Sequence, residues 1–345
     1  MSTERTRRRA RSDQTGSVGP VRRRGIAATG FEPFESGRGH HVKGQLGARV
    51  DGETFEQVAR LDAPTLVRAI ADAGGPSVEL VRLLEGGEVG AWLVAWPDSH
   101  HGVLTWLPGT NDRCTADEAQ ALMALARRAG VPVPTWEAVV GLGPLGTAVL
   151  QGCVAGAVPD RVSDALAEAL VGLADKRRGL LAGTAFAGMP MALYLTSPGP
   201  GFCLHEPLRA FGPKTAALLE RVHAVGERHG DHLVGDDIVH YDYHPGNVLV
   251  DPDRPDVVSW VVDWGGVRPG RVEVDLAILA FDLTWRAPGA PQQRVESHLR
   301  ARTDLATFEM VWAHASLRLL DWTIRHYPHD IDHWTTVAER HLPSL

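Results

Sequence analysis

Short apolar runs bounded by turn residues dominate residues 78–152, whereas apolar positions at helical spacing dominate after residue 155. The short runs are rich in β-branched and aromatic residues, which is typical of strands. Because turns separate them closely, they predict an antiparallel sheet of five strands. The predicted strands are 78–84, 91–96, 102–107, 136–141 and 147–152.

Two helices are expected beside this sheet. Asp62 is suited to cap a helix that ends at Gly74. Thr115 and Glu118 have the spacing of a capping box, which opens a second helix. The later helices are predicted at 163–181, 213–229, 274–285 and 306–326, with strands between 234 and 263. The fold class is therefore α+β, a small sheet lobe joined to a larger helical lobe, with a ligand cleft between them.

Composition separates a basic start from an acidic body. With 44% hydrophobic and 22% charged residues the chain is an ordinary globular one. Residues 1–24 carry a charge of about +6. Because the net charge of the chain is −7, the remaining residues carry about −13. Residues 1–60 lack periodicity, and we expect a disordered basic extension, followed by lobes over 61–152 and 153–345. The acidic body argues against nucleic acid as a partner and suits a cationic small molecule.

The spacing of the cysteines and the positions of glycines and prolines indicate where in the cell the protein is expected. Cys114, Cys153 and Cys203 lie far apart with no CxxC pattern, so neither a disulfide framework nor a zinc ribbon is indicated. A cytoplasmic location is the expectation that follows. The charge-free stretches 138–159 and 179–204 each contain five glycines as well as prolines. That density of breakers predicts turns and strands rather than membrane helices.

The candidate chemistry lies in the segment 238–250, which reads IVHYDYHPGNVLV. Its loop holds Asp242 and, five residues later, Asn247, and a third strand at 257–262 delivers Asp263. These side chains can converge at one edge of a small ribbon. Phosphoryl transfer needs such a set, because one carboxylate holds and deprotonates the acceptor hydroxyl while an Asn and a second carboxylate bind Mg²⁺.

The pattern His240-x-Asp242-x4-Asn247 followed by Asp263 resembles the paired motifs of kinases. In the form HYDYHPGNVLVD with VVDWGG it resembles the aminoglycoside phosphotransferase and antibiotic-kinase family. The resemblance implies that Asp242 is the catalytic base, that His240 supports the loop and that Asn247 and Asp263 are Mg²⁺ ligands. It also implies that Asp275, 12 residues after Asp263, braces the loop through backbone hydrogen bonds.

The resemblance further implies a protein-kinase-like two-lobed fold that uses ATP and Mg²⁺. The nucleotide would bind on the side of lobe 61–152, and the acceptor in lobe 153–345. The expected reaction moves the γ-phosphoryl group to a hydroxyl of a small molecule, most plausibly an aminoglycoside-type antibiotic. Two alternatives stay open: a kinase for a metabolite such as homoserine, choline or a sugar amine, and a catalytically silent pseudokinase.

The nucleotide side departs from the family pattern. Kinases carry a lysine on the third strand, but the three lysines of this chain lie outside the predicted sheet and Thr105 takes that position. Either an arginine, Arg82 or Arg113, substitutes for the lysine, or nucleotide binding is weakened. In kinases a helix glutamate pairs with that lysine, and Glu118 is the candidate here, although its capping-box role is the simpler explanation.

Backbone groups are the remaining nucleotide contacts that the resemblance implies. Gly86 and Gly87 lie where the family places its nucleotide-covering loop, and adenine is expected along Gln151 to Cys153. The GxGxxG match at 141–146 is interpreted as a β-turn, because its proline lacks the N–H that a phosphate cradle uses.

Two further alternatives concern metal and acceptor. His240, Asp242 and His244 alternate along the chain and form a possible HxDxH metal cluster. The helix over 306–326 carries a stripe typical of core residues. The carboxylates considered for a cationic acceptor are Asp282, Glu309 and Asp321.

Overall fold

The structure is a computed structural model that describes residues 49–50, 53–54, 61–84, 90–109 and 114–343. The chain divides into two units, Met1–Val42 and Lys43–Leu345, and all described residues belong to the second. Within the predicted basic extension, β1 (Arg49–Val50) pairs with β2 (Glu53–Thr54). The predicted glycine loop with Gly86 and Gly87 lies outside the described residues, as does Arg113.

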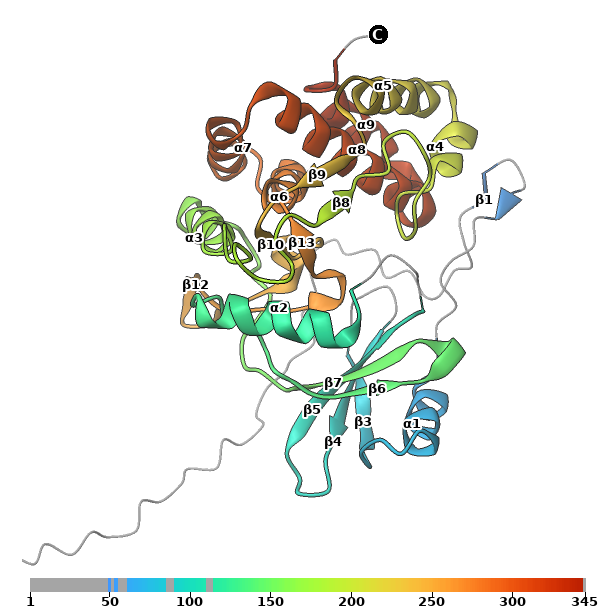
Figure 1. Ribbon diagram of the computed structural model, residues 1–345, viewed down its shortest axis with the longest axis vertical. Helices are drawn as coiled ribbons and strands as arrows, with labels where there is room; N and C mark the ends of the chain where they lie inside the picture. The colour runs from blue at the N-terminus through green and yellow to red at the C-terminus, as the bar shows by residue number, and fades with distance from the viewer. Residues whose placement is uncertain (1–48, 51–52, 55–60, 85–89, 110–113, 344–345) are drawn as a thin grey trace, which may run out of the picture. The chain divides into compact units, whose positions relative to one another are not determined.

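The predicted five-stranded antiparallel sheet is confirmed (Figure 1). Its strand order is β3-β4-β5-β7-β6, so β3 and β6 form the edges. A short 3₁₀ helix, η1 (Gly143–Leu145), joins β6 to β7, and the GxGxxG match is therefore a hairpin connection. The strands are β3 (Glu79–Leu84), β4 (Ala91–Ala95), β5 (His101–Leu107), β6 (Trp136–Gly141) and β7 (Thr147–Gly152).

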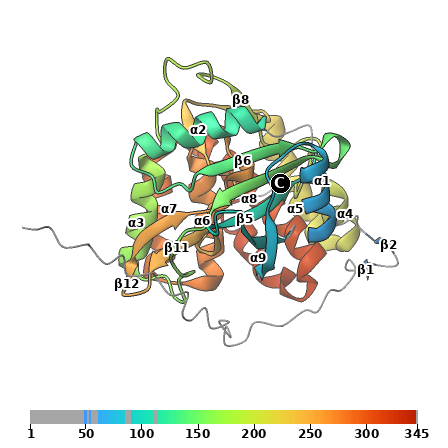
Figure 2. The ribbon, with the colours of Figure 1, turned by 90° about the horizontal axis from the view of Figure 1, so that it is seen from below.

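The two faces of the sheet belong to different cores (Figure 2). Helix α1 (Ala63–Asp72), which Asp62 caps through the N–H of Thr65 at 2.9 Å, packs on one face. Helix α2 (Ala116–Arg128) shares the other core with Val149 of β7. Alternate strand residues therefore point toward α1 or toward the helical part, as a period of two requires.

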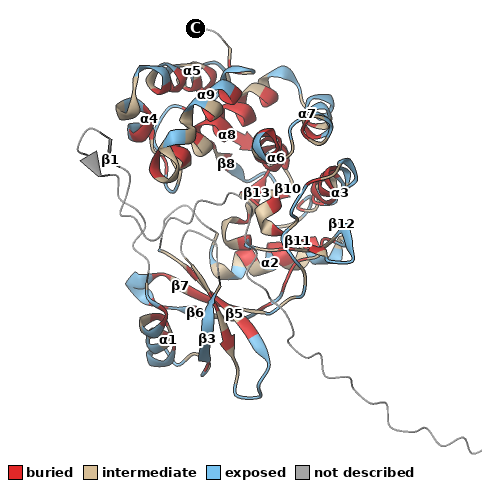
Figure 3. Ribbon diagram, turned by 180° about the vertical axis from the view of Figure 1, so that it is seen from behind, coloured by how far each residue is buried: buried red, intermediate tan, exposed pale blue. Residues whose placement is uncertain are grey.

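Helices form most of the chain after residue 160 and bury their apolar stripes against one another. Figure 3 shows that α6 and α8 consist mainly of buried residues. The helices are α3 (Asp164–Asp175), α4 (His205–Phe211), α5 (Pro213–His229), α6 (Glu273–Arg286), α7 (Ala290–Arg302), α8 (Leu305–His326) and α9 (Ile331–Glu339). Within the described ranges, no helix is long and apolar enough to cross a membrane.

Short paired strands lie in the segments between these helices. Strands β8 and β9 pair with each other, as do β10 and β13. The hairpin of β11 and β12 underlies the candidate site. The strands are β8 (Pro190–Ala192), β9 (His232–Val234), β10 (Asp237–Val239), β11 (Val248–Asp251), β12 (Arg254–Val261) and β13 (Arg268–Gly270).

One predicted helix is too long, and α4, α7 and α9 were absent from the prediction. The helix expected over 163–181 ends at Asp175, because the chain turns at Gly179, where φ is +63° and the N–H donates to the Asp237 carboxylate at 2.8 Å. Helix α7 was not predicted, because only three of its residues are buried and it carries little apolar periodicity.

Candidate active site

The hairpin of β11 and β12 brings Asn247 and Asp263 to one end. Val248 pairs with Val261, and the N–H of Val262 donates to the carbonyl of Asn247 at 2.9 Å. Asn247 therefore precedes the paired segment directly and Asp263 follows it directly. Asp263 has left-handed backbone angles (φ 62°, ψ 58°), which turn the chain out of the strand into the 3₁₀ helix η3 (Trp264–Gly266).

Asn247 fixes the carboxylate of Asp242. Its Nδ2 donates to the Asp242 carbonyl at 2.9 Å and to the Asp242 carboxylate at 2.8 Å. The two hydrogen bonds set the orientation of the amide, so its Oδ1 is left for another ligand. The Asp242 side chain keeps 46% of its surface exposed and can meet a substrate.

His240 is fully buried beneath the loop, and both of its ring nitrogens are engaged. Nε2 donates to the carbonyl of Val262 at 2.9 Å, and Nδ1 accepts from the N–H of Asp242 at 3.3 Å. Burial lowers the pKa of the imidazole to about 4, so the ring is neutral. The alternative HxDxH metal cluster is therefore wrong. Across the part of the chain that the structure describes, no group of three His, Cys, Asp or Glu side chains forms a metal site.

Asp275 lies in the first turn of α6, directly below the loop. Its buried carboxylate accepts the N–H of His240 at 2.7 Å and that of Tyr241 at 2.8 Å, and it is ion-paired with buried Arg177. Tyr241 is held at φ 73°, a left-handed conformation that a residue with a side chain rarely adopts. The carboxylate of Asp275 thus holds the strained backbone that presents Asp242.

Charges around Asp242 keep it ionised. Burial opposes its charge, but His244, whose Nε2 lies 3.5 Å from the carboxylate, and Arg318 outweigh this effect and lower the pKa of the carboxyl group. For His244, burial favours the neutral ring, yet the charge of Asp242 exceeds that effect and raises the pKa of the imidazole. Asp242 is therefore a carboxylate at neutral pH.

The donor set at the hairpin end fits Mg²⁺. The amide oxygen of Asn247 and the exposed carboxylate of Asp263 are oxygen ligands, which this hard cation prefers. Two protein ligands leave most positions for water and phosphate oxygens, as is usual for Mg²⁺ at nucleotide sites.

Thr105 and Arg82 lie on one face of the sheet. Thr105 pairs with Val149, which packs into the core shared with the helical part, so Thr105 points to the same side. Arg82 pairs with Leu93, and Leu93 with Val103, which shares its face with Thr105. The guanidinium group of Arg82 therefore lies on the face where kinases use their lysine.

The lysines and Glu118 do not supply the kinase ion pair. Lys176 donates to the carbonyl of Gly130 at 3.2 Å, Lys214 lies 3.9 Å from an aspartate of α9, and Lys43 lies outside the described residues. The carboxylate of Glu118 accepts from the backbone N–H of Thr115 at 2.8 Å and completes the capping box. Glu118 is thus a helix cap rather than the partner of a lysine.

In the linker between β7 and α3, some backbone groups already form hydrogen bonds within the protein. The N–H of Gly152 donates to the carbonyl of Thr135 at 3.1 Å, and that of Cys153 to the carbonyl of His101 at 3.2 Å. Gln151 pairs within the sheet on both sides. The N–H of Cys153 is therefore committed, and an adenine contact at Gln151 and Cys153 stays a prediction that would use carbonyl groups.

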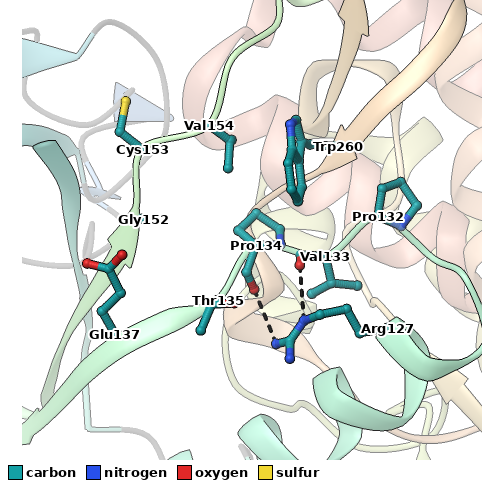
Figure 4. Close-up of a pocket in the computed structure, with 10 residues that line it drawn as sticks. All are labelled: Arg127, Pro132, Val133, Pro134, Thr135, Glu137, Gly152, Cys153, Val154 and Trp260. Atoms are coloured by element: carbon teal, nitrogen blue, oxygen red, sulfur yellow. Dashed lines mark hydrogen bonds between the residues drawn. The ribbon is translucent and has the colours of Figure 1, made fainter. Parts of the chain in front are cut away.

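A cavity of about 390 Å³ lies beside this linker (Figure 4). Arg127 at its rim donates to the carbonyls of Val133 at 3.1 Å and Pro134 at 3.4 Å. Because none of the candidate catalytic residues lines it, this cavity is separate from the proposed phosphoryl site. Its lining residues are Arg127, Pro132, Val133, Pro134, Thr135, Glu137, Gly152, Cys153, Val154 and Trp260.

The three carboxylates considered for a cationic acceptor each contact a basic side chain. Asp321 is fully buried and also accepts the N–H of Leu204 at 2.8 Å. None of the three is therefore a bare anion facing a ligand. The ion pairs are Asp282 with Arg286 (2.9 Å), Glu309 with His229 (2.7 Å) and Asp321 with Arg325 (2.8 Å).

A five-stranded antiparallel sheet, a helical part and an Asp-Asn-Asp loop and hairpin define a kinase-like phosphotransferase. The sequence model of the phosphotransferase enzyme family matches residues 104–318, and the chain belongs to this family. The family resemblance, the two-lobed α+β fold and the enzyme class predicted from the sequence are thereby confirmed. No curated protein sequence matches the chain significantly.

Solved structures with the same fold are aminoglycoside phosphotransferases. A thermostable mutant of aminoglycoside phosphotransferase APH(4)-Ia, in ternary complex with AMP-PNP and hygromycin B, is 14% identical, with 80% of this chain and 96% of that chain covered and a TM-score of 0.53. Aminoglycoside phosphotransferase APH(4)-Ia itself is 15% identical over 78% of this chain and 94% of that chain, with a TM-score of 0.52. At these identities the likeness shows the fold.

Proposed function

We propose that the protein transfers the γ-phosphoryl group of ATP to a hydroxyl of a small molecule. The observation that carries this proposal is the double hydrogen bond from Asn247 to Asp242, made at the hairpin end that also bears Asp263. It couples the residue that would hold the acceptor to a residue that would hold the metal. Mg²⁺, when bound, bridges and neutralises phosphate oxygens.

In this proposal Asp242 orients the acceptor hydroxyl. Its lowered pKa makes it a weak base, so it accepts a hydrogen bond from the hydroxyl and takes the proton only as the new P–O bond forms. Asn247 and Asp263 would hold the metal, and Asp275 would keep the loop in place through the N–H groups of His240 and Tyr241.

The acceptor class and the location are parts of the same proposal. Hygromycin B in the ternary complex of a structure with the same fold supports an aminoglycoside-type acceptor. The ion pairs of Asp282, Glu309 and Asp321 count against a polycationic acceptor. A kinase for a metabolite alcohol, of the homoserine, choline or sugar-amine type, is therefore the alternative. A cytoplasmic location, proposed from the cysteine spacing, accords with both.

A second candidate, a silent nucleotide-binding protein, is favoured by one observation, namely Thr105 in the place of the kinase lysine. Turnover separates the two. ADP formation from Mg-ATP would be measured with kanamycin A, hygromycin B, homoserine, choline and glucosamine, and Mg-ATP affinity by calorimetry. The enzyme turns over at least one acceptor, whereas the silent protein binds Mg-ATP without acceptor-dependent turnover.

The substitution Asp242→Asn tests the assigned base. It should lower the rate by about 10²–10⁴-fold and leave Mg-ATP affinity close to wild type, because the carboxylate meets the acceptor rather than the nucleotide. Asp251→Asn is the matched control, since Asp251 lies at the far end of β11 in an ion pair with Arg254. Full activity of Asp242→Asn would remove the assignment of this loop.

A further inference from the structure

Basic side chains gather around Tyr241, the residue before the proposed base. The guanidinium carbon of Arg268 lies 3.7 Å from the centroid of the Tyr241 ring, and that of Arg318 lies 4.1 Å from it. Arg318 also donates to the carbonyl of Tyr241 at 3.3 Å. Arg318 therefore lies close to Asp242, and its charge contributes to keeping Asp242 ionised.

Arg318 retains hydrogen-bonding capacity. It lies on α8 and is half-buried, and none of the carboxylates that the structure describes forms an ion pair with it. A guanidinium group has five N–H donors, and the hydrogen bonds to the carbonyl and to the side chain of Tyr241 leave at least one donor for a ligand. Its planar fork matches the two oxygens of a carboxylate or of a phosphate.

No compensating anion stands ready for a cationic acceptor among the carboxylates considered. Asp282, Glu309 and Asp321 each contact an arginine or a histidine, so an ammonium group would have to displace that partner. The same ammonium group would approach Arg318 and Arg268 with like charge, which is unfavourable at short range. An anionic group would instead be attracted to Arg318, and this attraction offsets the repulsion from Asp242.

We propose that the acceptor is an alcohol that also carries an anionic group, a carboxylate or a phosphate, and that Arg318 binds this group. The inference rests on the proposed function and narrows its acceptor class. Arg318 contacts the backbone carbonyl of the residue before Asp242, so an anion held by its fork places a neighbouring hydroxyl of the same molecule beside the base.

The test compares acceptors of different charge. D-glucuronate, D-glucose and D-glucosamine share a pyranose ring and most hydroxyls, and carry a negative, a neutral and a positive substituent. D-glucose 6-phosphate is included as an acceptor with a phosphate group, and kanamycin A as an acceptor with several positive charges. Phosphoryl transfer from Mg-ATP to each is measured as kcat/KM, with acceptor-independent ATP hydrolysis recorded in parallel.

Two variants locate the effect at Arg318. Arg318→Gln keeps a donor for the Tyr241 carbonyl but loses the charge, and Arg318→Lys keeps the charge but loses the fork. We expect Arg318→Gln to lower kcat/KM for the anionic sugars by about 10- to 100-fold more than for glucose, with partial recovery in Arg318→Lys. Arg300→Gln is the control, because Arg300 stacks on Phe308 at 4.1 Å within the helical part.

The outcomes separate this inference from the proposed function. The inference is supported if the enzyme prefers an anionic sugar and if this preference is lost in Arg318→Gln but kept in Arg300→Gln. Which of the two anionic sugars is preferred then distinguishes a carboxylate from a phosphate. Preference for glucosamine or kanamycin A, an unchanged preference in Arg318→Gln, or ATP hydrolysis without transfer to any sugar overturns the inference. If the wild-type protein neither binds nor hydrolyses Mg-ATP, the proposed function itself is refuted.

Discussion

Replacing Asp275 by Asn tests whether this carboxylate holds the catalytic loop. In the wild type it accepts the N–H groups of His240 and Tyr241 and neutralises Arg177, all in a buried setting. Asparagine keeps one acceptor oxygen, presents an NH₂ group where the other oxygen stood, and leaves Arg177 without a counter-charge. Removing one partner of a buried ion pair costs about 3–5 kcal/mol, and a buried N–H without an acceptor costs about 1–3 kcal/mol.

These contributions share the same atoms and do not add, so we expect a loss of about 3–5 kcal/mol in the free energy of unfolding. The loop should respond locally as well. Tyr241 at φ 73° stores roughly 1–3 kcal/mol of strain, which the carboxylate holds in place. Once released, the amides of His240 and Tyr241 should exchange with solvent about 10- to 100-fold faster, and phosphoryl transfer should fall with them.

Glu273→Gln is the matched control for this substitution. Glu273 lies in the same first turn of α6, is fully buried and pairs with Arg178 and Arg271, but it makes no contact with the loop. Its arginine partners are partly exposed and can be hydrated, so its loss should cost stability without altering exchange at Tyr241. Denaturant unfolding and amide exchange are measured on both variants. Unchanged exchange at Tyr241 in Asp275→Asn, or equal loss of activity in Glu273→Gln, would refute the bracing role.

Asp263→Asn should raise the Mg²⁺ concentration needed for half-maximal activity, and an unchanged Mg²⁺ titration would exclude this metal site. Thr105→Lys should tighten ATP binding in calorimetric titration if no arginine serves the phosphates, whereas a loss of affinity in Arg82→Ala would show that Arg82 already does. Hydrogen bonding from His341 lowers the pKa of Glu296 to about 2, so its stabilisation is complete above pH 4.5 and lost as the pH falls toward 2. Glu296→Gln should therefore cost about 1–2 kcal/mol in urea unfolding at pH 6 and less at pH 3, and a constant difference would contradict this sign.

The strands and the positions of the candidate site residues were predictable because their signals are local. Alternating runs bounded by turns gave the five strands, and the positions of Asp242, Asn247 and Asp263 relative to short strands foretold their convergence at the hairpin. Asp275 was implied by the family resemblance, and the structure places its carboxylate on the N–H groups of His240 and Tyr241.

Contacts between distant segments could not be predicted in this way. Arg177 meets Asp275 across 98 positions and Arg318 meets Tyr241 across 77, and neither arginine stands out from its helix in sequence. The carboxylate Asp321 had the right type for an acceptor contact, yet Arg325, one turn later on α8, neutralises it. Side-chain pairing after folding, rather than residue type, decides which charges remain for a ligand.

Backbone strain marks the same site independently of the charges. The described residues other than glycine that have positive φ are Ser99, Tyr194, Tyr241 and Asp263, and two of these flank the proposed chemistry. Tyr241 directly precedes Asp242, and Asp263 directly precedes η3 at the end of the β11–β12 hairpin. Such strain persists only where surrounding bonds over-determine it, and here Asp275 and the β11–β12 ladder provide them.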